Sequence, residues 1–160
     1  MPTLTSALTV EAWVRPVSDT LVQTIAARWD FPSTDDAART FALTLQPGSR
    51  LVFETDETST RRPEVLTATV PQLHDGRAHH VAATWDQRRF ALFVDGSEVA
   101  AKTSQGGTLN PALTTLSMIG GQTRGFPANG VIDEPTIYSR ALAASEIGAI
   151  HLAGQSGKCS

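Results

Sequence analysis

The sequence contains a single cysteine, few aromatic residues and few charges, and each shortage excludes a class of protein. Cys159 has no second cysteine in the chain, so it either pairs outside this segment in an extracellular parent or is an exposed thiol. No apolar run reaches the roughly 18 residues that a membrane-spanning helix needs. The 13 basic residues are scattered and outnumbered by 16 acidic ones, giving a net charge of −3. That balance argues against nucleic acid and anionic membranes as partners, because phosphates need a basic field.

The length and the two ends indicate one module of a larger protein. At 160 residues the chain fits a single domain. Its first residues lack the basic start and apolar run of a secretory signal peptide, and its last residues are polar. We expect a domain over residues 1–153, followed by a tail or linker over residues 154–160.

The stretch GRAHHVAATWDQRRFALFVDG (residues 76–96) is the clearest structural signal in the chain. Small, β-branched and aromatic residues alternate from His80 to Trp85, which indicates a strand half buried against a core. Residues 90–94 are all apolar and predict a strand inside a sheet. Asp95-Gly96 then predicts a type I′ turn, because both central positions of that turn need a positive φ. The stretch therefore predicts a meander of antiparallel strands that continues over Ser97–Ala100.

Further strand patterns occur along the whole chain, separated by clusters of Gly, Pro, Asp and Ser. Such spacing is typical of a β-sandwich or jelly roll. We expect these strands over residues 8–15, 21–29, 40–45, 51–55, 65–70, 115–119 and 131–138. One helical pattern follows at residues 143–152, with Leu142, Ile147, Ile150 and His151 on its inner side.

Three stretches resemble a known family. HHVAATWDQRRFALFVDG (residues 79–96) is similar to the central signature of the laminin-G-like domains in the concanavalin A-like lectin/glucanase superfamily. LTVEAWVRP (8–16) resembles their first core strand, and GVIDEPTIYSRALAASEI (130–147) resembles their last strand and short helix. The resemblance implies an all-β fold, a concanavalin A-like β-sandwich (jelly roll) of two antiparallel sheets with one short C-terminal helix. Relatives usually cap that helix with Ser or Thr where this chain has Ala143, so we expect capping by Ser145 or a frayed first turn.

For function, the resemblance implies a non-catalytic recognition module that binds carbohydrate within a larger secreted or cell-surface protein. The alternative is a protein–protein adhesion or assembly module that binds no sugar. Retaining glycoside hydrolases of the superfamily share an E-x-D-x-E strand, which places two carboxylates beside the scissile bond. Here Glu54 and Asp56 share a face, but Thr58 occupies the third position and Glu57 points to the opposite face. We therefore expect no enzyme, and expect a glycan or protein ligand together with neighbouring domains as partners.

The positions of the aromatic residues indicate where a ligand would bind. Five lie in strands and are expected in the core: Trp13, Phe41, Phe53, Phe90 and Phe93. Trp85 fits either the core or a ligand-binding surface. Sugars are bound by aromatic faces, with amide and charged groups bonding their hydroxyls, and three further aromatic residues lie at strand ends or in loops. The expected ligand-binding patch therefore consists of Trp29, Asp30, Phe31, Arg124, Phe126 and Asn129.

Acidic residues near the two ends of the chain raise the question of a metal ion. Asp133 begins the last strand after a loop, where jelly-roll relatives often place a calcium ligand. Calcium takes roughly six to eight oxygen ligands, so we expect a structural Ca²⁺ with Asp133 as one ligand and the others unassigned. The resemblance also places Glu11 and Glu134 on neighbouring strands. Two facing carboxylates repel unless a cation such as Arg28 or a metal ion lies between them.

Three histidines lie close together in the sequence, at positions 74, 79 and 80. His79 and His80 are adjacent on a strand, so their side chains point to opposite faces and do not readily bind one ion. Relatives carry the same pair as part of their framework. We therefore expect packed or hydrogen-bonded histidines rather than a metal site.

Overall fold

The computed structural model describes residues 6–29, 39–57, 63–110, 117–121 and 126–154. Within them lie strands, one short 3₁₀ helix (η2) and one α-helix. The bounds of these elements are β1 Ala7–Pro16, β2 Gln23–Trp29, β3 Arg39–Gln46, β4 Arg50–Thr55, β5 Glu64–Thr69, η2 Pro71–His74, β6 His79–Asp86, β7 Arg89–Val94, β8 Ser97–Thr103, β9 Ser117–Ile119, β10 Gly130–Tyr138 and α1 Ala144–Gly154.

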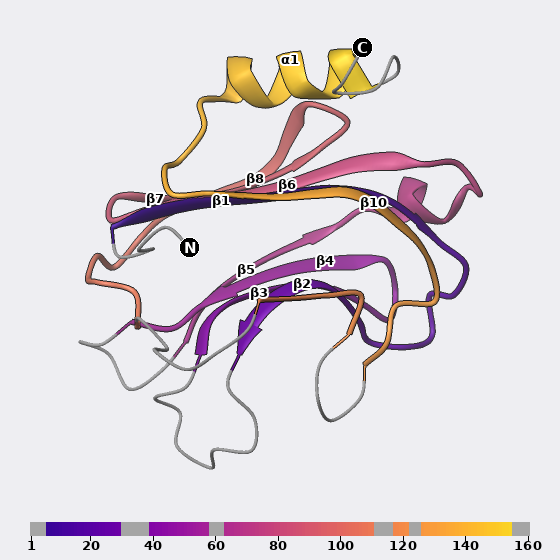
Figure 1. Cartoon of the computed structure of the whole chain (residues 1–160), viewed down its shortest axis with the longest axis horizontal. Helices are drawn as coiled ribbons and strands as arrows, with labels where there is room; N and C mark the ends of the chain where they lie inside the picture. The colour runs from indigo at the N-terminus through magenta and orange to yellow at the C-terminus, as the bar shows by residue number, and fades with distance from the viewer. Residues whose placement is uncertain (1–5, 30–38, 58–62, 111–116, 122–125, 155–160) are drawn as a thin grey trace.

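The strands form two antiparallel five-stranded sheets that pack face to face (Figure 1). The first sheet, called the upper sheet here, has the order β10-β1-β6-β7-β8, so the first and last strands are neighbours. The lower sheet has the order β5-β4-β3-β2-β9. Helix α1, yellow in Figure 1, lies over the outer face of the upper sheet. The predicted all-β sandwich with one C-terminal helix is therefore confirmed.

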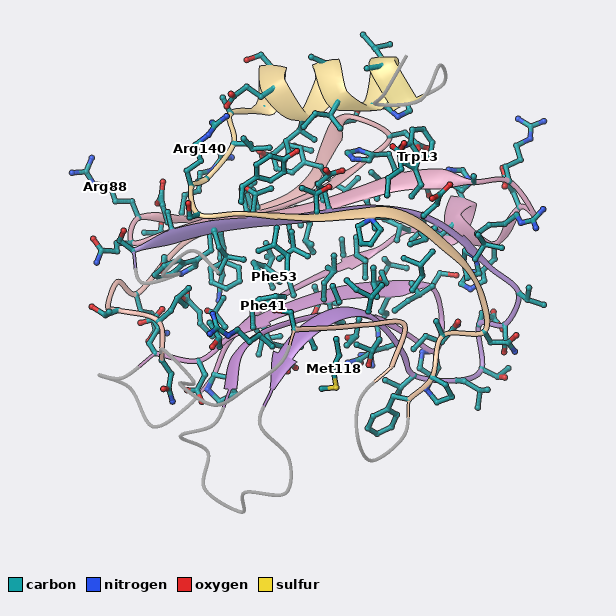
Figure 2. All side chains as sticks on the ribbon, viewed as in Figure 1. Trp13, Phe41, Phe53, Arg88, Met118 and Arg140 are labelled. Atoms are coloured by element: carbon teal, nitrogen blue, oxygen red, sulfur yellow. The ribbon has the colours of Figure 1, made fainter. Side chains whose placement is uncertain are left out.

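The main core fills the space between the two sheets. Phe41 and Phe53 point into it from the lower sheet (Figure 2), and Phe90 meets them from the upper sheet. Trp85 also belongs to this core and is fully buried, with its Nε1–H donated to Ser104 Oγ over 3.1 Å. Burying each of these aromatic side chains contributes roughly 1.5–3 kcal/mol. The core positions of Phe41, Phe53 and Phe90 are confirmed, and Trp85 is assigned to the core.

The meander of β6, β7 and β8 has the predicted turn. Asp95 and Gly96 both have a positive φ, 50° and 75°, as a type I′ turn requires. The turn lies against α1, because a Cβ atom built on Gly96 would stand 3.2 Å from Gly148 Cα and 3.3 Å from His151 Cβ. Glycine is thus required at position 96 both for its backbone conformation and for the close approach of the helix.

Helix α1 covers a second, smaller cluster of apolar residues on the outer face of the upper sheet. Leu142 and Ile147 are buried there against Ala82, Ala91 and Phe93. Phe93 is therefore buried as expected, but beneath the helix rather than between the sheets. Among the described residues no helix combines the length and the apolar composition needed to cross a lipid bilayer.

The start of α1 differs from the sequence-based expectation. Glu146, rather than Ser145, caps it, because a Glu146 carboxylate oxygen accepts the Ala143 backbone N–H over 2.8 Å. This is the glutamate half of a capping box. Arg140 binds the same carboxylate through two hydrogen bonds of 2.8 and 2.7 Å. Together the guanidinium and the backbone donor lower the pKa of Glu146 to about 2. The helix also extends through Gly154, one residue beyond the expected end of the domain.

Candidate functional site

Strand β1 presents two different faces. Val10, Ala12 and Val14 fill the main core, so Glu11, Trp13 and Arg15 alternate with them and lie on the outer face of the upper sheet. Trp13 is half-buried there and points toward the C-terminal end of α1 (Figure 2). The expectation that Trp13 belongs to the core between the sheets is wrong, because that side of β1 is already taken by the aliphatic residues.

Two neighbouring histidine rings and the end of the helix hold Trp13 in place. His151 stacks on its indole, with ring centroids 5.5 Å apart and planes inclined by 25°, and His80 packs at a steeper angle at the same distance. Gly154 lies so close that a Cβ atom there would stand 2.4 Å from Trp13 Cζ2. Trp13 is therefore a fixed wall rather than a free aromatic platform.

A β-bulge in β10 faces this tryptophan. Glu11 pairs with Thr136 and Trp13 with Asp133, so β10 carries one more residue than β1 across this interval. The extra residue is accommodated at Glu134, which adopts a positive φ of 49°. The following Pro135 has no N–H to donate, which an edge strand and a bulge both tolerate. A non-glycine residue in this conformation is uncommon and often marks a functional site.

Beside Trp13 and the bulge is a cavity of about 650 Å³. Its volume lies within the range of small-molecule sites. The walls come from β1, β10, the turn before β6 and the end of α1: Trp13, Val14, Arg15, Gly76, Arg77, Ala78, Val131, Asp133, Glu134 and Gly154. We call it the Trp13 cavity.

Three charged side chains of the Trp13 cavity are exposed to a ligand: Arg15, Arg77 and Asp133. Arg15 and Arg77 are exposed, and within the described residues neither guanidinium forms an ion pair or a hydrogen bond. Asp133 is also exposed, and its one hydrogen bond is to the adjacent Glu134 backbone N–H, 2.9 Å away. Val131 adds an apolar surface that is 47% exposed. Two cationic and two acidic side chains thus line one hollow together with apolar surface.

Glu11 and His80 form a buried hydrogen-bonded pair under α1, behind the cavity. Glu11 Oε2 is 2.8 Å from His80 Nε2, and both side chains are completely buried. The Tyr138 hydroxyl donates to the other Glu11 oxygen over 3.3 Å. Burial and the Glu11 carboxylate raise the pKa of Tyr138. The expectation that Arg28 compensates Glu11 is wrong, because Arg28 lies on β2 in the lower sheet and His80 is the basic side chain beside Glu11. A metal ion near Glu11 stays a prediction.

His79 and His74 are hydrogen bonded, as expected. His79 Nδ1 is 2.8 Å from Asp95 Oδ2, and His79 Nε2 is 3.0 Å from Asp75 Oδ1. Burial alone lowers the pKa of His79, but hydrogen bonds and charge from the two carboxylates outweigh it and raise that pKa. His74 bonds Ser49 Oγ through Nδ1 over 2.9 Å. These contacts give the histidines structural roles.

The expected ligand-binding patch lies largely outside the described residues, which do not include Asp30, Phe31, Arg124 or the side chain of Trp29. Phe126 is 48% exposed, and its carbonyl accepts the Thr24 N–H over 3.0 Å, near the start of β2. Trp29 ends the same strand five residues after Thr24, about 17 Å along it at about 3.3 Å per residue. Asn129 lies near Phe126 and donates its N–H to Gln23 Oε1 over 2.7 Å. The structure therefore groups Phe126 with Asn129 but does not place Trp29 beside them.

The expected calcium site at Asp133 has few ligands around it. Asp133 and Glu134 are neighbours in the cavity, but among the described residues no group of three or more His, Cys, Asp and Glu side chains is arranged to hold a metal ion. Calcium needs more oxygens than these two carboxylates supply. The described residues therefore do not by themselves fit a calcium shell, and calcium at Asp133 stays a prediction.

A comparison of the sequence with protein-family models identifies the family. The laminin-G model of the concanavalin A-like lectin/glucanases superfamily matches residues 1–148. The chain belongs to this superfamily. The resemblance carried by residues 8–16, 79–96 and 130–147 is thereby confirmed. No curated protein matches the chain.

Solved structures of the same fold include sugar-binding domains. The CBM40 domain of the Ruminococcus gnavus IT-sialidase, bound to α2,3-sialyllactose, matches with a TM-score of 0.76 and 17% identity, covering 92% of this chain and 83% of that one. The binding domain of botulinum neurotoxin serotype G matches with a TM-score of 0.71 and 13% identity, covering 97% of this chain and 38% of that one. The binding domain of botulinum neurotoxin DC, in complex with SialylT, matches with a TM-score of 0.65 and 12% identity, covering 92% and 35%. At these identities the similarity establishes the fold.

Proposed function

We propose that this domain is a non-catalytic carbohydrate-binding module and that the Trp13 cavity is its binding site. The carrying observation is the convergence of three exposed charged side chains on one hollow: Arg15, Arg77 and Asp133 line a cavity of about 650 Å³ beside a fixed tryptophan. Exposed charged groups gathered around apolar surface suit a polyhydroxylated ligand.

The binding mechanism follows from the chemistry of these side chains. A guanidinium presents several N–H donors in a plane and a carboxylate presents two acceptors, so each can bond a pair of neighbouring sugar hydroxyls. Val131 and the edge of Trp13 offer apolar surface to the C–H groups of the ring. The cavity is open on one side, so we expect weak binding that neighbouring modules of a longer chain would strengthen through avidity.

The comparison structures support this proposal without locating the site. Two of them, the sialidase CBM40 domain and the neurotoxin DC binding domain, were solved with sialyllactose and SialylT. A glycan-recognition role of this kind suits a secreted or cell-surface parent protein. Of the acids that most nearly resemble a hydrolase motif, Asp56 is only 5% exposed and so has little access to a substrate. This burial supports a recognition role for the domain.

The test is a glycan-array screen followed by calorimetric titration of the bound glycan, with α2,3-sialyllactose and lactose as a matched acidic and neutral pair. Arg77→Ala and Asp133→Ala each remove a charged hydrogen-bonding group, worth roughly 1.5–3 kcal/mol, so affinity should fall at least about tenfold. Arg88→Ala is the control, because Arg88 is exposed at the distant edge of the sandwich (Figure 2). Equal affinities for all variants would show that sugar binds elsewhere, and an empty array would contradict the function.

An adhesion or assembly module is the second candidate, and an apolar end of the sandwich favours it. Val17 is 75% exposed, Phe126 48% and Ile119 45%. Backbone hydrogen bonds hold these segments together, because Val17 N–H donates to Asn129 O and Thr24 N–H to Phe126 O, over 2.8 and 3.0 Å. If no glycan binds, but a protein partner binds the wild-type domain and does not bind a Phe126→Asp variant, the adhesion or assembly role replaces carbohydrate binding as the proposed function.

Calcium at Asp133 is tested in the same experiments. Unfolding temperatures with millimolar Ca²⁺ and with EDTA would differ by several degrees if the folded state binds the ion, since a ligand of the folded state stabilises it by mass action. The difference should vanish in Asp133→Ala. Equal unfolding temperatures in the wild-type protein would mean that the folded domain binds no calcium, and sugar binding would then be the only role proposed for Asp133.

A further inference from the structure

The edge where the two sheets meet at β5 and β8 is closed by buried polar groups. Glu64, the first residue of β5, is at their centre and is 6% exposed. It accepts hydrogen bonds from Ser104 Oγ over 2.8 Å and from the Gln105 N–H over 3.2 Å, and Lys102 Nζ is 3.2 Å away. Donors from β8 and the segment after it therefore already satisfy this carboxylate.

Glu57 lies beside Glu64 and has no such donors. It is 3% exposed, and within the described residues neither of its carboxylate oxygens accepts a hydrogen bond from an N–H or O–H group. Its charged neighbours there are Glu64, Asp56 and Lys102. An ionised carboxylate that is buried without donors is costly, whereas a protonated one becomes a donor itself.

We propose that Glu57 keeps a proton and donates it to Glu64, and that this shared proton latches the segment around Leu109 onto the lower sheet until a rise in pH through neutrality removes it. The latched segment is directly attached to Glu57. Glu57 forms an isolated β-bridge with Leu109, and Asn110 N–H donates to the adjacent Asp56 carbonyl over 2.9 Å. Asn110 O in turn accepts the Thr40 hydroxyl over 2.8 Å. The inference is independent of the proposed sugar binding.

The electrostatics agree with this geometry. Burial raises the pKa of Glu57, and the hydrogen bond with Glu64 and repulsion by Glu64 and Asp56 raise it further. Lys102 lowers it, and the resulting pKa is about 7. A carboxyl whose pKa is raised on folding binds more protons in the folded state. Its contribution to stability is therefore largest in acid and falls as pH rises from about 4.5 to about 7.

The test is amide hydrogen exchange at Asn110 in the wild-type protein at pH 6 and pH 8.5, corrected for the intrinsic exchange rate. The Asn110 protection factor should fall about tenfold, since pH 6 lies about one unit below the pKa of Glu57 and each unit is a tenfold change in equilibrium. The Val70 amide, bonded to Ser49 O at the other end of the lower sheet, should keep its protection. In Glu57→Gln, whose amide donates without titrating, Asn110 protection should be the same at both pH values.

Three results would overturn the latch. The first is equal protection of Asn110 at both pH values in the wild-type protein. The second is a fall in Asn110 protection in Glu57→Gln that is as large as the fall in the wild-type protein. Glu98→Gln, on the exposed side of β8, is the matched control for this variant. The third is restoration of protection at pH 8.5 by added Ca²⁺, which would mean that the carboxylates share a cation instead. If Glu57→Gln does not fold, a carboxyl-carbon NMR titration of wild-type Glu57 decides, with a midpoint near 7 supporting the latch and one near 4.5 opposing it.

Discussion

The buried pair of Glu11 and His80 offers the sharpest test of how this sandwich is held together behind the Trp13 cavity. Neither side chain has any solvent-exposed surface, and their nitrogen and oxygen are 2.8 Å apart. Replacing Glu11 by Ala would leave His80 buried without its acceptor and would remove the partner of the Tyr138 hydroxyl. Leaving a buried polar group without its hydrogen-bond partner typically costs about 1–3 kcal/mol, and Glu11→Ala would leave two such groups, on His80 and Tyr138. That is a sizeable part of the roughly 5–15 kcal/mol that stabilises a domain.

Denaturant unfolding of Glu11→Ala would measure this cost, with Glu98→Ala as the matched control. Glu98 pairs with Arg89 over 2.7 Å, but both side chains are well exposed. An exposed pair contributes about 0–1 kcal/mol, so the control should lose little. The double variant Glu11→Leu/His80→Leu should recover most of the lost stability, because apolar residues of similar volume often replace a buried pair without loss.

This prediction is refuted if Glu11→Ala and Glu98→Ala lower the free energy of unfolding by the same small amount. It is also refuted if the double variant is as unstable as Glu11→Ala, because the double variant contains no unpaired His80 and the loss would then have another origin. The first result would mean that water or a shift of α1 satisfies His80 at little cost.

Two further predictions concern the surroundings of the cavity. Gly154→Val should displace the end of α1 from Trp13, weaken glycan binding and cost about 1–3 kcal/mol of stability through overpacking. Ala153→Val, on the exposed side of the helix, should change neither glycan affinity nor stability. Calorimetric titration and denaturant unfolding measure the two effects. Asp95 and Asp75 raise the pKa of His79 in the folded protein. The stability that protonated His79 contributes should therefore be complete below its ordinary pKa of about 6.5 and be lost as pH rises through the higher pKa of the folded state. A His79→Gln variant should lack this part of the pH profile, and an unchanged profile would argue against the carboxylate contacts.

The fold could be predicted largely from the sequence because its signals are local. The alternation from His80 to Trp85 and the Asp95-Gly96 turn each depend on a few neighbouring residues, and both are present in the structure. The aromatic core positions follow from the same periodicity. The cap of α1 is local too, because Glu146 accepts the N–H of Ala143 three residues earlier and binds Arg140 six residues earlier. The sequence interpretation missed it because it looked for a Ser or Thr cap rather than for the glutamate of a capping box.

The cavity was harder to predict because it is assembled from distant segments. Trp13 was expected in the core, yet the sequence EAWVR carries a usable signal: Glu11, Trp13 and Arg15 share one face of β1, opposite the aliphatic residues. Arg77 and Gly154 had no such signal, because only the packing of the turn before β6 and of α1 brings them to β1. The pairing of Glu11 with His80 likewise depends on the register of β1 with β6. Trp29, Asp30, Phe31 and the other members of the expected patch stay predictions.

The most direct test of the central claim is an amide NMR titration with the glycan that binds best in the array. The account predicts saturable shifts that are largest at Trp13, Arg77 and Val131, the residues that line the cavity. Shifts centred on Phe126 and Asn129 instead would place the ligand on the patch expected from sequence. Shifts absent at every amide would contradict sugar binding by this domain.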